Sequence, residues 1–315
     1  MVDPIQEKAI VPINLARMRF DRVAADLFPE FSRGRLQQWI QSGELTIDGV
    51  SQAPKFKVNA GAVLVIDAIP EVLDDFAEEI PLDIIYEDEE VLVINKPAGL
   101  VVHPGAGNRT GTLLNALLHH CGDLEAIPRA GIVHRLDKNT TGLMVVAKTL
   151  PAQNHLVAEL QDREVSRVYE AIAYGVLKRP GFVEAPMGRH RTQRTKMSVR
   201  DDGKSALTHY KAIKTYSRYT HLELSLETGR THQIRVHMQH LGYPLVGDPT
   251  YGGHFRSPPG VDLSPLAIAL RDFPRQALHA RRLSFLHPNG DEEVSFEVPL
   301  PNDMVELIGI MDLSE

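Results

Sequence analysis

The stretch GIVHRLDKNTTGLMVVAK (residues 131–148) joins a charged turn directly to an apolar run with strand character. In the turn, Asp137 is flanked by His134, Arg135 and Lys138. Nearby cations favour the ionised form of a carboxylate, so this residue could act as a charged nucleophile or base at neutral pH. Taken alone, the spacing fits a salt-bridged Asp in a turn better. The choice between the two depends on the rest of the chain.

The segments around this turn mix β and helical patterns without a regular order. Apolar alternation and β-branched residues predict strands at 91–95, 143–146, 168–174, 204–213 and 222–226. Helical spacing of apolar residues predicts helices at 111–119, 151–161, 231–241 and 302–311. Because helices do not follow strands one by one, we expect an α+β fold whose sheet is mixed or antiparallel rather than doubly wound.

The first part of the chain has a pattern of its own. Helices are predicted over 19–27 and between Ser32 and Gly43, and short strands over 45–47 and 62–66. Ser32 would cap the second helix, and Asp48-Gly49 would turn between the strands. Two helices and a small β unit indicate a separate α+β module at residues 16–75.

An acidic stretch follows this module. Residues 66–90 contain eleven Asp and Glu, no Lys or Arg, and two prolines, Pro70 and Pro81. Since like charges repel and proline resists packing, we expect a linker at 76–82, ahead of a large domain at 83–315. The net charge of the chain is −7, but its 41 Asp and Glu less these eleven leave 30 against 34 Lys and Arg. The net charge therefore does not exclude an anionic partner.

Basic residues gather between positions 187 and 200, a window without Asp or Glu. The cluster includes Arg189, Arg191, Arg194 and Lys196. A solvated basic loop explains most clusters of this kind. Binding of an anionic partner is the alternative, and charge alone leaves it open.

Composition excludes several classes of protein. A chain of 315 residues with 43% hydrophobic and 24% charged residues is typical of a soluble globular protein of about two domains. No apolar run approaches the roughly 20 residues of a membrane span, and the N-terminal residues lack an apolar export signal. The single Cys121 permits no internal disulfide, which fits the reducing cytoplasm. Metal-ligand spacings, phosphate loops and serine-hydrolase motifs are missing, so we expect neither a metal nor a nucleotide cofactor.

A second candidate segment is ETGRTHQIRVHMQH, residues 227–240. Gly229 ends the preceding strand, and Arg230 and Arg235 are available to anions around the helix that follows. Taken alone, the segment is explained better as a surface helix with two bases. Tyr169 lies on a predicted strand, where a tyrosine is most often part of the core.

Together, these segments resemble the motifs of a known family. In the family's order, they are NKPAGLVVHPG (95–105), AGIVHRLDKNTTGLMVVAK (130–148), REVSRVYEAIAYG (163–175), ETGRTHQIRVHMQHLGYPLVGDPTYGG (227–253) and QALHARRLSFLHP (276–288). The family is that of the RNA pseudouridine synthases that modify ribosomal RNA. The region 16–66, with SRGRLQQWIQSGELTIDG, is similar to an S4 RNA-binding domain. The resemblance covers nearly the whole chain and is strongest to members that act on the large subunit.

The resemblance implies a reaction and a set of residue roles. Uridine would become pseudouridine: the N1–C1′ bond breaks, the uracil turns, and it rejoins through C5, with no cofactor, redox change or metal. Asp137 would be the nucleophile, and Arg235 would pair with its carboxylate. Tyr169 would pack against the target base, while Arg135 would help to hold the RNA and the displaced base.

The resemblance also implies a partner. The substrate would be large-subunit (23S) ribosomal RNA, free or in the assembling subunit, at the stem-loop called helix 69, and the enzyme would act in the cytoplasm. A target base must leave its stack, which costs a few kcal/mol. RNA phosphates would be bound by Arg189, Arg191, Arg194 and Lys196, and by Arg33 and Arg35 of the small module.

Two other functions fit parts of the pattern. A non-catalytic RNA-binding or ribosome-assembly protein could keep the S4-like module and use the sheet as a platform. Asp137 together with Arg235 favours the enzyme, because a binding protein needs neither. A hydrolase that used Asp137 would usually want a second carboxylate. The sequence leaves open whether the Asp attacks C1′ of the ribose or C6 of the base.

Overall fold

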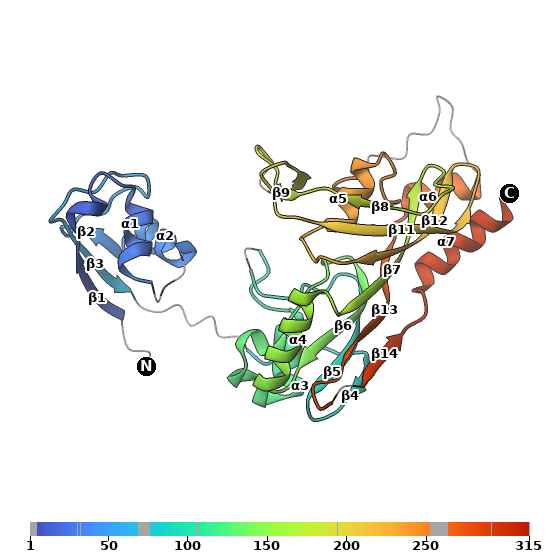
Figure 1. Cartoon of the computed structure of the whole chain (residues 1–315), viewed down its shortest axis with the longest axis horizontal. Coiled ribbons are helices and arrows are strands. Elements are labelled where there is room, and N and C mark those ends of the chain that lie inside the picture. The colour runs from blue at the N-terminus through green and yellow to red at the C-terminus, as the bar shows by residue number, and fades with distance from the viewer. Residues whose placement is uncertain are drawn as a thin grey trace. The chain divides into compact units, whose positions relative to one another are not determined.

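The computed structural model describes residues 5–29, 31, 33–68, 76–105, 107–193, 195–252, 264–290 and 292–314, without the side chains of 33 and 35. The chain divides into two compact units, Met1–Asp74 and Asp75–Glu315 (Figure 1). In the described ranges, no helix is both long and apolar enough to cross a membrane.

The described part of the small unit is a three-stranded antiparallel sheet with two α-helices and a short 3-10 helix. Its strands, in spatial order, are β1 (Ile5–Ile10), β3 (Val63–Ala68) and β2 (Leu45–Ile47). Its helices are η1 (Ile13–Leu15), α1 (Phe20–Leu27) and α2 (Arg33–Ser42). Leu36, Ile40 and Leu64 are among the side chains that form its buried core. The small unit therefore has a hydrophobic core of its own, as expected of an α+β module.

Local sequence explains most of this unit. Asp48 and Gly49 both have positive φ (50° and 78°), which is the backbone that a tight two-residue hairpin turn requires. The predicted helices and strands lie within about two residues of the observed ones, although Ser32 lies outside the described residues. The sequence did not reveal β1, because Ile5–Ile10 is a largely exposed edge strand without apolar alternation.

The expected linker at 76–82 lies against the large unit. Ile80 and Leu82 pack on its main hydrophobic cluster. The carboxylate of Glu78 accepts the backbone N–H of Gly111 (3.0 and 3.1 Å), and the Asn115 amide donates to the carbonyl of Phe76 (2.8 Å). These apolar and hydrogen-bonded contacts outweigh the acidic composition, so this segment is a packed arm rather than a solvated spacer.

The large unit contains a nine-stranded sheet and a separate hairpin. The strands of the sheet, in spatial order, are β4 (Ile84–Glu87), β5 (Val91–Lys96), β6 (Thr141–Ala147), β13 (Leu278–Leu286), β7 (Ser166–Tyr174), β12 (Tyr219–Leu226), β11 (Leu207–Thr215) and β8 (Gly181–Glu184), with β14 (Glu293–Glu297) paired to β13. Only the β6–β13 pair is parallel among the pairings of this sheet. Strands β9 (Met187–Arg189) and β10 (Met197–Val199) form the hairpin. The expected α+β fold with a mixed sheet is confirmed.

The helices of the large unit cover both faces of this sheet. They are α3 (Leu113–His120), η2 (Gly122–Ala126), η3 (Pro128–Gly131), α4 (Leu150–Asp162), α5 (Gln233–His240), α6 (Pro265–Asp272) and α7 (Asn302–Leu313). Strand β6 shows the two-sided packing, because Met144 and Val146 join the cluster under α3 whereas Leu143 and Val145 join the one under α4. Figure 1 shows α3 and α4 beside this part of the sheet, and α6 and α7 in the half with β11 and β12.

A close approach of two backbones brings the C-terminal part of the chain to the Asp137 loop. Gly142 (φ 114°) pairs with Ala280, and a Cβ at this glycine would lie 2.2 Å from the Ala280 carbonyl oxygen. Glycine is therefore required where β6 meets β13. Strand β13 was not among the predicted strands, and neither were the short strands β4, β8, β9, β10 and β14.

Candidate active site

Asp137 lies in the loop between η3 and β6, and the loop is closed by its own hydrogen bonds. The Thr140 N–H donates to the Asp137 carbonyl (3.0 Å), and the Thr140 hydroxyl accepts from the Gln276 amide (2.9 Å). The Arg275 guanidinium, which is itself ion-paired with Asp303, donates to the carbonyl of Asn139 (3.2 Å). Residues just ahead of β13 thus fix the turn that presents the carboxylate.

A buried lysine fixes the same loop from the other side. Lys96 has no exposed surface, and its Nζ donates to the carbonyls of Pro97 (2.7 Å), Leu100 (3.0 Å) and Lys138 (3.0 Å). Burial lowers the pKa of Lys96 to about 7, while the charge of Asp137 acts in the opposite direction. The ammonium therefore ties the 97–100 turn to the residue that follows Asp137.

Arg235, on α5, bridges two carboxylates. Its Nη1 donates to Asp137 Oδ2 (2.8 Å), and its Nε and Nη2 donate to the two oxygens of Asp248 (2.7 and 2.9 Å). The side chain of Asp248 is wholly buried, that of Arg235 is 6% exposed, and that of Asp137 is 17% exposed. Because Asp248 holds two corners of the planar guanidinium, the third corner is already aimed at Asp137.

Asp248 is held in its charged form by this arrangement. Burial alone would raise the pKa of Asp248, but its hydrogen bonds with Arg235 and the charge of that residue hold the pKa below its ordinary value. The backbone N–H groups of Thr250 (2.8 Å) and Tyr251 (3.0 Å) also donate to its Oδ1. The Oδ1 atom of Asp137, in contrast, accepts no hydrogen bond from a described residue and is the oxygen left for chemistry.

A histidine and a tyrosine connect this oxygen to the basic hairpin. The Met197 N–H of β10 donates to Tyr251 Oη (2.8 Å), so the Tyr251 proton is directed to His232 Nδ1, 2.8 Å away. Burial lowers the pKa of His232, with Asp137 acting against it. A neutral His232 that accepts at Nδ1 carries its proton on Nε2, which lies 3.8 Å from Asp137 Oδ1.

The cation beside Asp137 is not one of its sequence neighbours. His134 accepts the Val145 N–H at Nε2 (3.0 Å), and burial lowers its pKa to about 3, so it is neutral. Arg135 and Lys138 are exposed. The ion pair is made by Arg235, which is 98 positions away in the chain. The expectation that His134 is one of the cations around Asp137 is therefore wrong, because its Nε2 is used as a hydrogen-bond acceptor.

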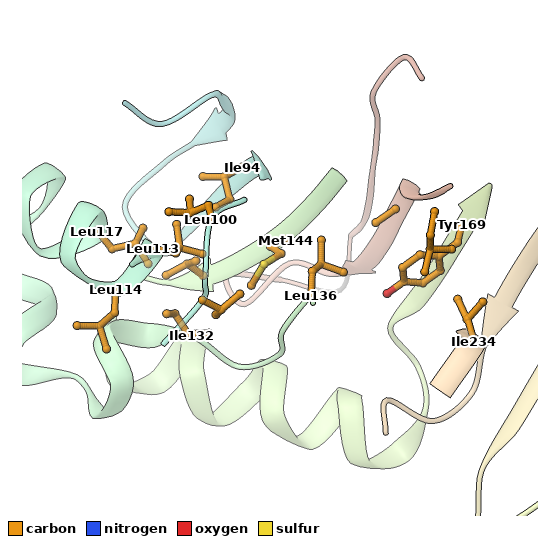
Figure 2. Close-up of a cluster of buried hydrophobic side chains, with 14 of the residues drawn as sticks. Ile94, Leu100, Leu113, Leu114, Leu117, Ile132, Leu136, Met144, Tyr169 and Ile234 are labelled. Carbon is orange, nitrogen blue, oxygen red and sulfur yellow. The ribbon is translucent and has the colours of Figure 1, made fainter. Parts of the chain in front are cut away.

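Asp137 opens into a cavity of about 410 Å³. Part of its wall is formed by Leu136, Tyr169 and Ile234. These residues belong to the main hydrophobic cluster and are labelled at the right of Figure 2. Burial raises the pKa of Tyr169, so its hydroxyl is neutral, and it makes no hydrogen bond to a described residue. The cavity thus combines a carboxylate, an aromatic ring and two aliphatic side chains, a combination suited to a planar base.

The predicted RNA-binding residues fall in different places. Arg135 lines the cavity mouth as an exposed side chain, Arg189 and Arg191 are exposed on the β9–β10 hairpin, and Lys196 is half-buried there. Arg194 and the side chains of Arg33 and Arg35 lie outside the described residues. Arg200, in the same basic window, pairs with Asp202 and donates to the Arg189 carbonyl, so it is partly neutralised.

Sequence reasoning missed Asp248, His232 and Tyr251 as site residues. All three lie inside the quoted 227–253 motif, but the Gly-Asp-Pro sequence that contains Asp248 is typical of a turn. The only signal was that an acid, Asp248, lies just one glycine after the short apolar run Leu245-Val246. Their roles depend on contacts with residues up to about a hundred positions away, which no local pattern contains.

Comparison with known proteins gives the site its context. Residues 90–240 match the model of the family described as RNA pseudouridylate synthase. A protein of Pseudomonas aeruginosa named ribosomal large subunit pseudouridine synthase D is 56% identical, over 99% of this chain and 97% of that protein. The chain belongs to the RNA pseudouridylate synthase family. An Escherichia coli (strain K12) protein with the same name is 51% identical, over 99% and 96% of the two chains. The predicted family, and the predicted likeness to its members that act on the large subunit, are confirmed.

Solved structures of the RNA pseudouridylate synthase family share this fold. Human RNA pseudouridylate synthase domain containing 4 is 27% identical, with a TM-score of 0.57 over 73% of this chain and 92% of that chain. Human RNA pseudouridylate synthase domain containing 1 is 25% identical, with a TM-score of 0.53 over 75% and 89%. The expected enzyme class, an isomerase that acts on RNA uridines, is confirmed. The roles of individual residues and the domain boundaries remain predictions.

Proposed function

We propose that this enzyme converts specific uridines of large-subunit (23S) ribosomal RNA to pseudouridine, with Asp137 as the nucleophile. The names of its relatives support the substrate. The observation that carries the residue assignment is the bridge Asp137–Arg235–Asp248, which orients one carboxylate towards a cavity that also holds Tyr169. A half-buried acid that is held by an arginine, itself fixed by a second acid, is a preorganised reacting group.

In the proposed chemistry, one carboxylate first adds to the substrate and is later released unchanged. Oδ1 of Asp137 adds to C1′ of the ribose or to C6 of the uracil, and the N1–C1′ bond breaks. The uracil turns, C5 bonds to C1′, C5 loses its proton, and N1 ends with a proton, so the product is an isomer and the carboxylate is regenerated. Arg235 holds Oδ2 throughout, which leaves Oδ1 as the attacking atom. The proposed reaction needs no metal, redox cofactor or energy source.

The remaining residues would bind and position the RNA. Tyr169 would lie against the uracil ring, since an aromatic wall replaces the stacking that a displaced base loses. Arg135 would help to hold the RNA and the displaced base. Phosphates would lie along the hairpin, near Arg189, Arg191, Arg194 and Lys196.

The small unit would add affinity. We assign residues 16–75 as an S4-like RNA-binding domain, with Arg33 and Arg35 as candidate phosphate contacts, and we propose helix 69 of the large-subunit RNA as the target. The basis is the sequence resemblance of the SRGRLQQWIQSGELTIDG segment together with the unit's own hydrophobic core. The single cysteine fits a cytoplasmic location.

The test is to map pseudouridine in ribosomal RNA from cells that lack the protein. Wild type should restore the missing sites, and Asp137→Asn should restore none, because the amide keeps the shape of the side chain but is not a nucleophile. Asp123→Asn, at an exposed position on η2, is the matched control and should behave as wild type. RNA binding by purified Asp137→Asn should remain within a few-fold of wild type.

Two results would overturn the assignment. If Asp137→Asn restored modification, the nucleophile would be another residue. If the RNA of the deletion cells had lost no pseudouridine, the substrate proposal would fail, whatever the fate of the variant. A protein that bound RNA but modified none, in wild-type form, would support the RNA-binding alternative instead.

A further inference from the structure

Arg167 is a second buried arginine in the cavity, and the mechanism above does not use it. It lies on β7 two residues before Tyr169, so both side chains point to the same face of the strand. Arg167 is 6% exposed, and it lines the cavity with Asp137 and Tyr169. The charges of Arg167 and Asp137 both act on the Tyr169 hydroxyl, with opposite effects on its pKa. The tyrosine therefore lies within electrostatic range of both groups.

The guanidinium of Arg167 is poorly satisfied by the protein. Its Nε has no hydrogen-bond partner among the described residues. Its Nη2 is 3.4 Å and 3.5 Å from the carbonyls of Glu227 and Leu226, which are long contacts. No described carboxylate lies within ion-pair distance of it. Burial lowers the pKa of Arg167, which reflects the cost of a cation in this environment.

The fold leaves room for this charge. Gly229 does not have a left-handed φ, so its backbone does not require glycine. A Cβ at this position, however, would lie 2.7 Å from Arg167 Nη1. Gly229, between β12 and α5, thus leaves room for the guanidinium itself, which lies against its backbone.

The charges around the cavity indicate what would bind to this guanidinium. Its described lining contains Arg129, Arg135, Arg167, Arg230 and Arg235, three histidines and one acid, Asp137. Only Arg235 among these arginines is paired with Asp137 and Asp248. A uracil ring is neutral, so it cannot balance this excess of positive charge, whereas each nucleotide of an RNA strand brings one negative phosphate. A guanidinium is a good match to a phosphate because its planar fork donates two parallel hydrogen bonds.

We propose that Arg167 binds a phosphate of the RNA backbone next to the target uridine, and so forms a phosphate subsite within the catalytic cavity. The proposal rests on the proposed function, because it assumes that the substrate is RNA. It divides the cavity into a nucleoside part, formed by Asp137, Tyr169 and Ile234, and a backbone part, formed by Arg167 where its guanidinium lies against Gly229.

The test combines one RNA change with one protein change. Target RNA fragments are made with a single uncharged methylphosphonate at each linkage flanking the target uridine in turn. For wild type, one of these linkages should lower kcat/KM about tenfold, because a charge-assisted bond is lost. Arg167→Gln should show a similar loss on unmodified RNA, and no further loss when that linkage is neutralised. Arg167→Lys keeps the charge but not the planar fork, so its kcat/KM should lie between those of wild type and Arg167→Gln. It replaces the Gln variant in this test if that variant does not fold.

A control and a stability measurement separate binding from a structural role. Arg163→Gln, at a surface arginine paired with Glu227, should leave the methylphosphonate effect unchanged. Arg167→Met should raise Tm, because it removes a buried charge that has no ion-pair partner. Removing an arginine with a purely structural role should lower Tm instead. The proposal is overturned if the two losses multiply at every linkage, or if Arg167→Met and Arg167→Gln both lower Tm while no linkage is sensitive. Wild-type activity on unmodified RNA tests the proposed function separately.

Discussion

Two buried arginines line one cavity, and they differ in what the protein gives them to hold. Arg235 makes three charge-assisted hydrogen bonds to two acids, whereas Arg167 has two long contacts to carbonyls and an unpartnered Nε. The first is satisfied by the fold and organises the site before any substrate arrives. The second is left for a ligand to satisfy. The same residue type can therefore stabilise the protein in one place and reduce its stability in favour of binding in another.

The largest expected effect is that of removing Arg235. Arg235→Ala leaves Asp248 buried and unpaired, which should lower the free energy of unfolding by about 3–5 kcal/mol. The chemical step should slow by about 10²–10³, because Asp137 loses the group that orients it. Urea unfolding and single-turnover pseudouridine formation measure the two effects. Arg235→Lys should recover only part of each, since it lacks the fork.

The comparison with Arg167 makes that prediction sharper. Arg167→Met should change stability in the opposite direction from Arg235→Ala. If both substitutions destabilised the protein equally, the two arginines would be structurally equivalent, and the distinction between a paired and an unpaired arginine would fail.

A smaller effect should appear in the acid stability of the protein. The folded pKa of Asp248 lies below its unfolded value of 3.8, so its ionisation stabilises the fold above that pH and the contribution is lost as the pH falls through the folded pKa. Asp248→Asn should lower the free energy of unfolding by about 1–3 kcal/mol at neutral pH. The gap to wild type should narrow below pH 3.8. Unfolding curves at several pH values measure this, and a gap that stays constant down to the lowest pH would contradict it.

The smallest effect should come from a substitution of Gly229, which lies beside the Arg167 guanidinium. Gly229→Ala places a Cβ 2.7 Å from Nη1, and the end of a flexible side chain can move aside. We expect stability near that of wild type and a loss of kcat/KM of about 2–5-fold, because the guanidinium is displaced from its position. In an Arg167→Met background the same substitution should cost nothing more. Equal losses in both backgrounds would show that Gly229 acts independently of Arg167.

Much of the architecture could be predicted because the local spacing of apolar residues indicates helices and strands. Strand β6 and helices α4 and α5 were predicted within a few residues from apolar spacing and turn residues. Strand β13 was not, although it lies between β6 and β7 in the sheet, because charged Arg281 and Arg282 interrupt its alternation. Arg281 is satisfied by Glu170 and Glu297, partners that only the folded sheet supplies.

The candidate site was predicted in part for a different reason, namely the resemblance of its motifs to those of a known family. Asp137, Tyr169 and Arg235 lie in distinct motifs, and the fold places them around one cavity. The residues missed are those whose role depends on a long-range partner: Asp248 on Arg235, and Arg167 on the lack of any acid near it. A sequence does not show whether an arginine has an acidic partner in the folded protein, so it cannot distinguish a paired arginine from an unpaired one.

The hydrogen-bonded chain from Met197 through Tyr251 to His232 has a thermodynamic consequence. It connects a strand of the basic hairpin to the side chain beside Asp137. Coupling between two sites is reciprocal. RNA that bound the proposed hairpin site and shifted it would therefore change the affinity of the cavity for a nucleotide by the same factor by which the nucleotide changed the affinity of the hairpin for RNA. Discrimination between correct and incorrect RNA would then be distributed along the strand, because each contact would report on the other.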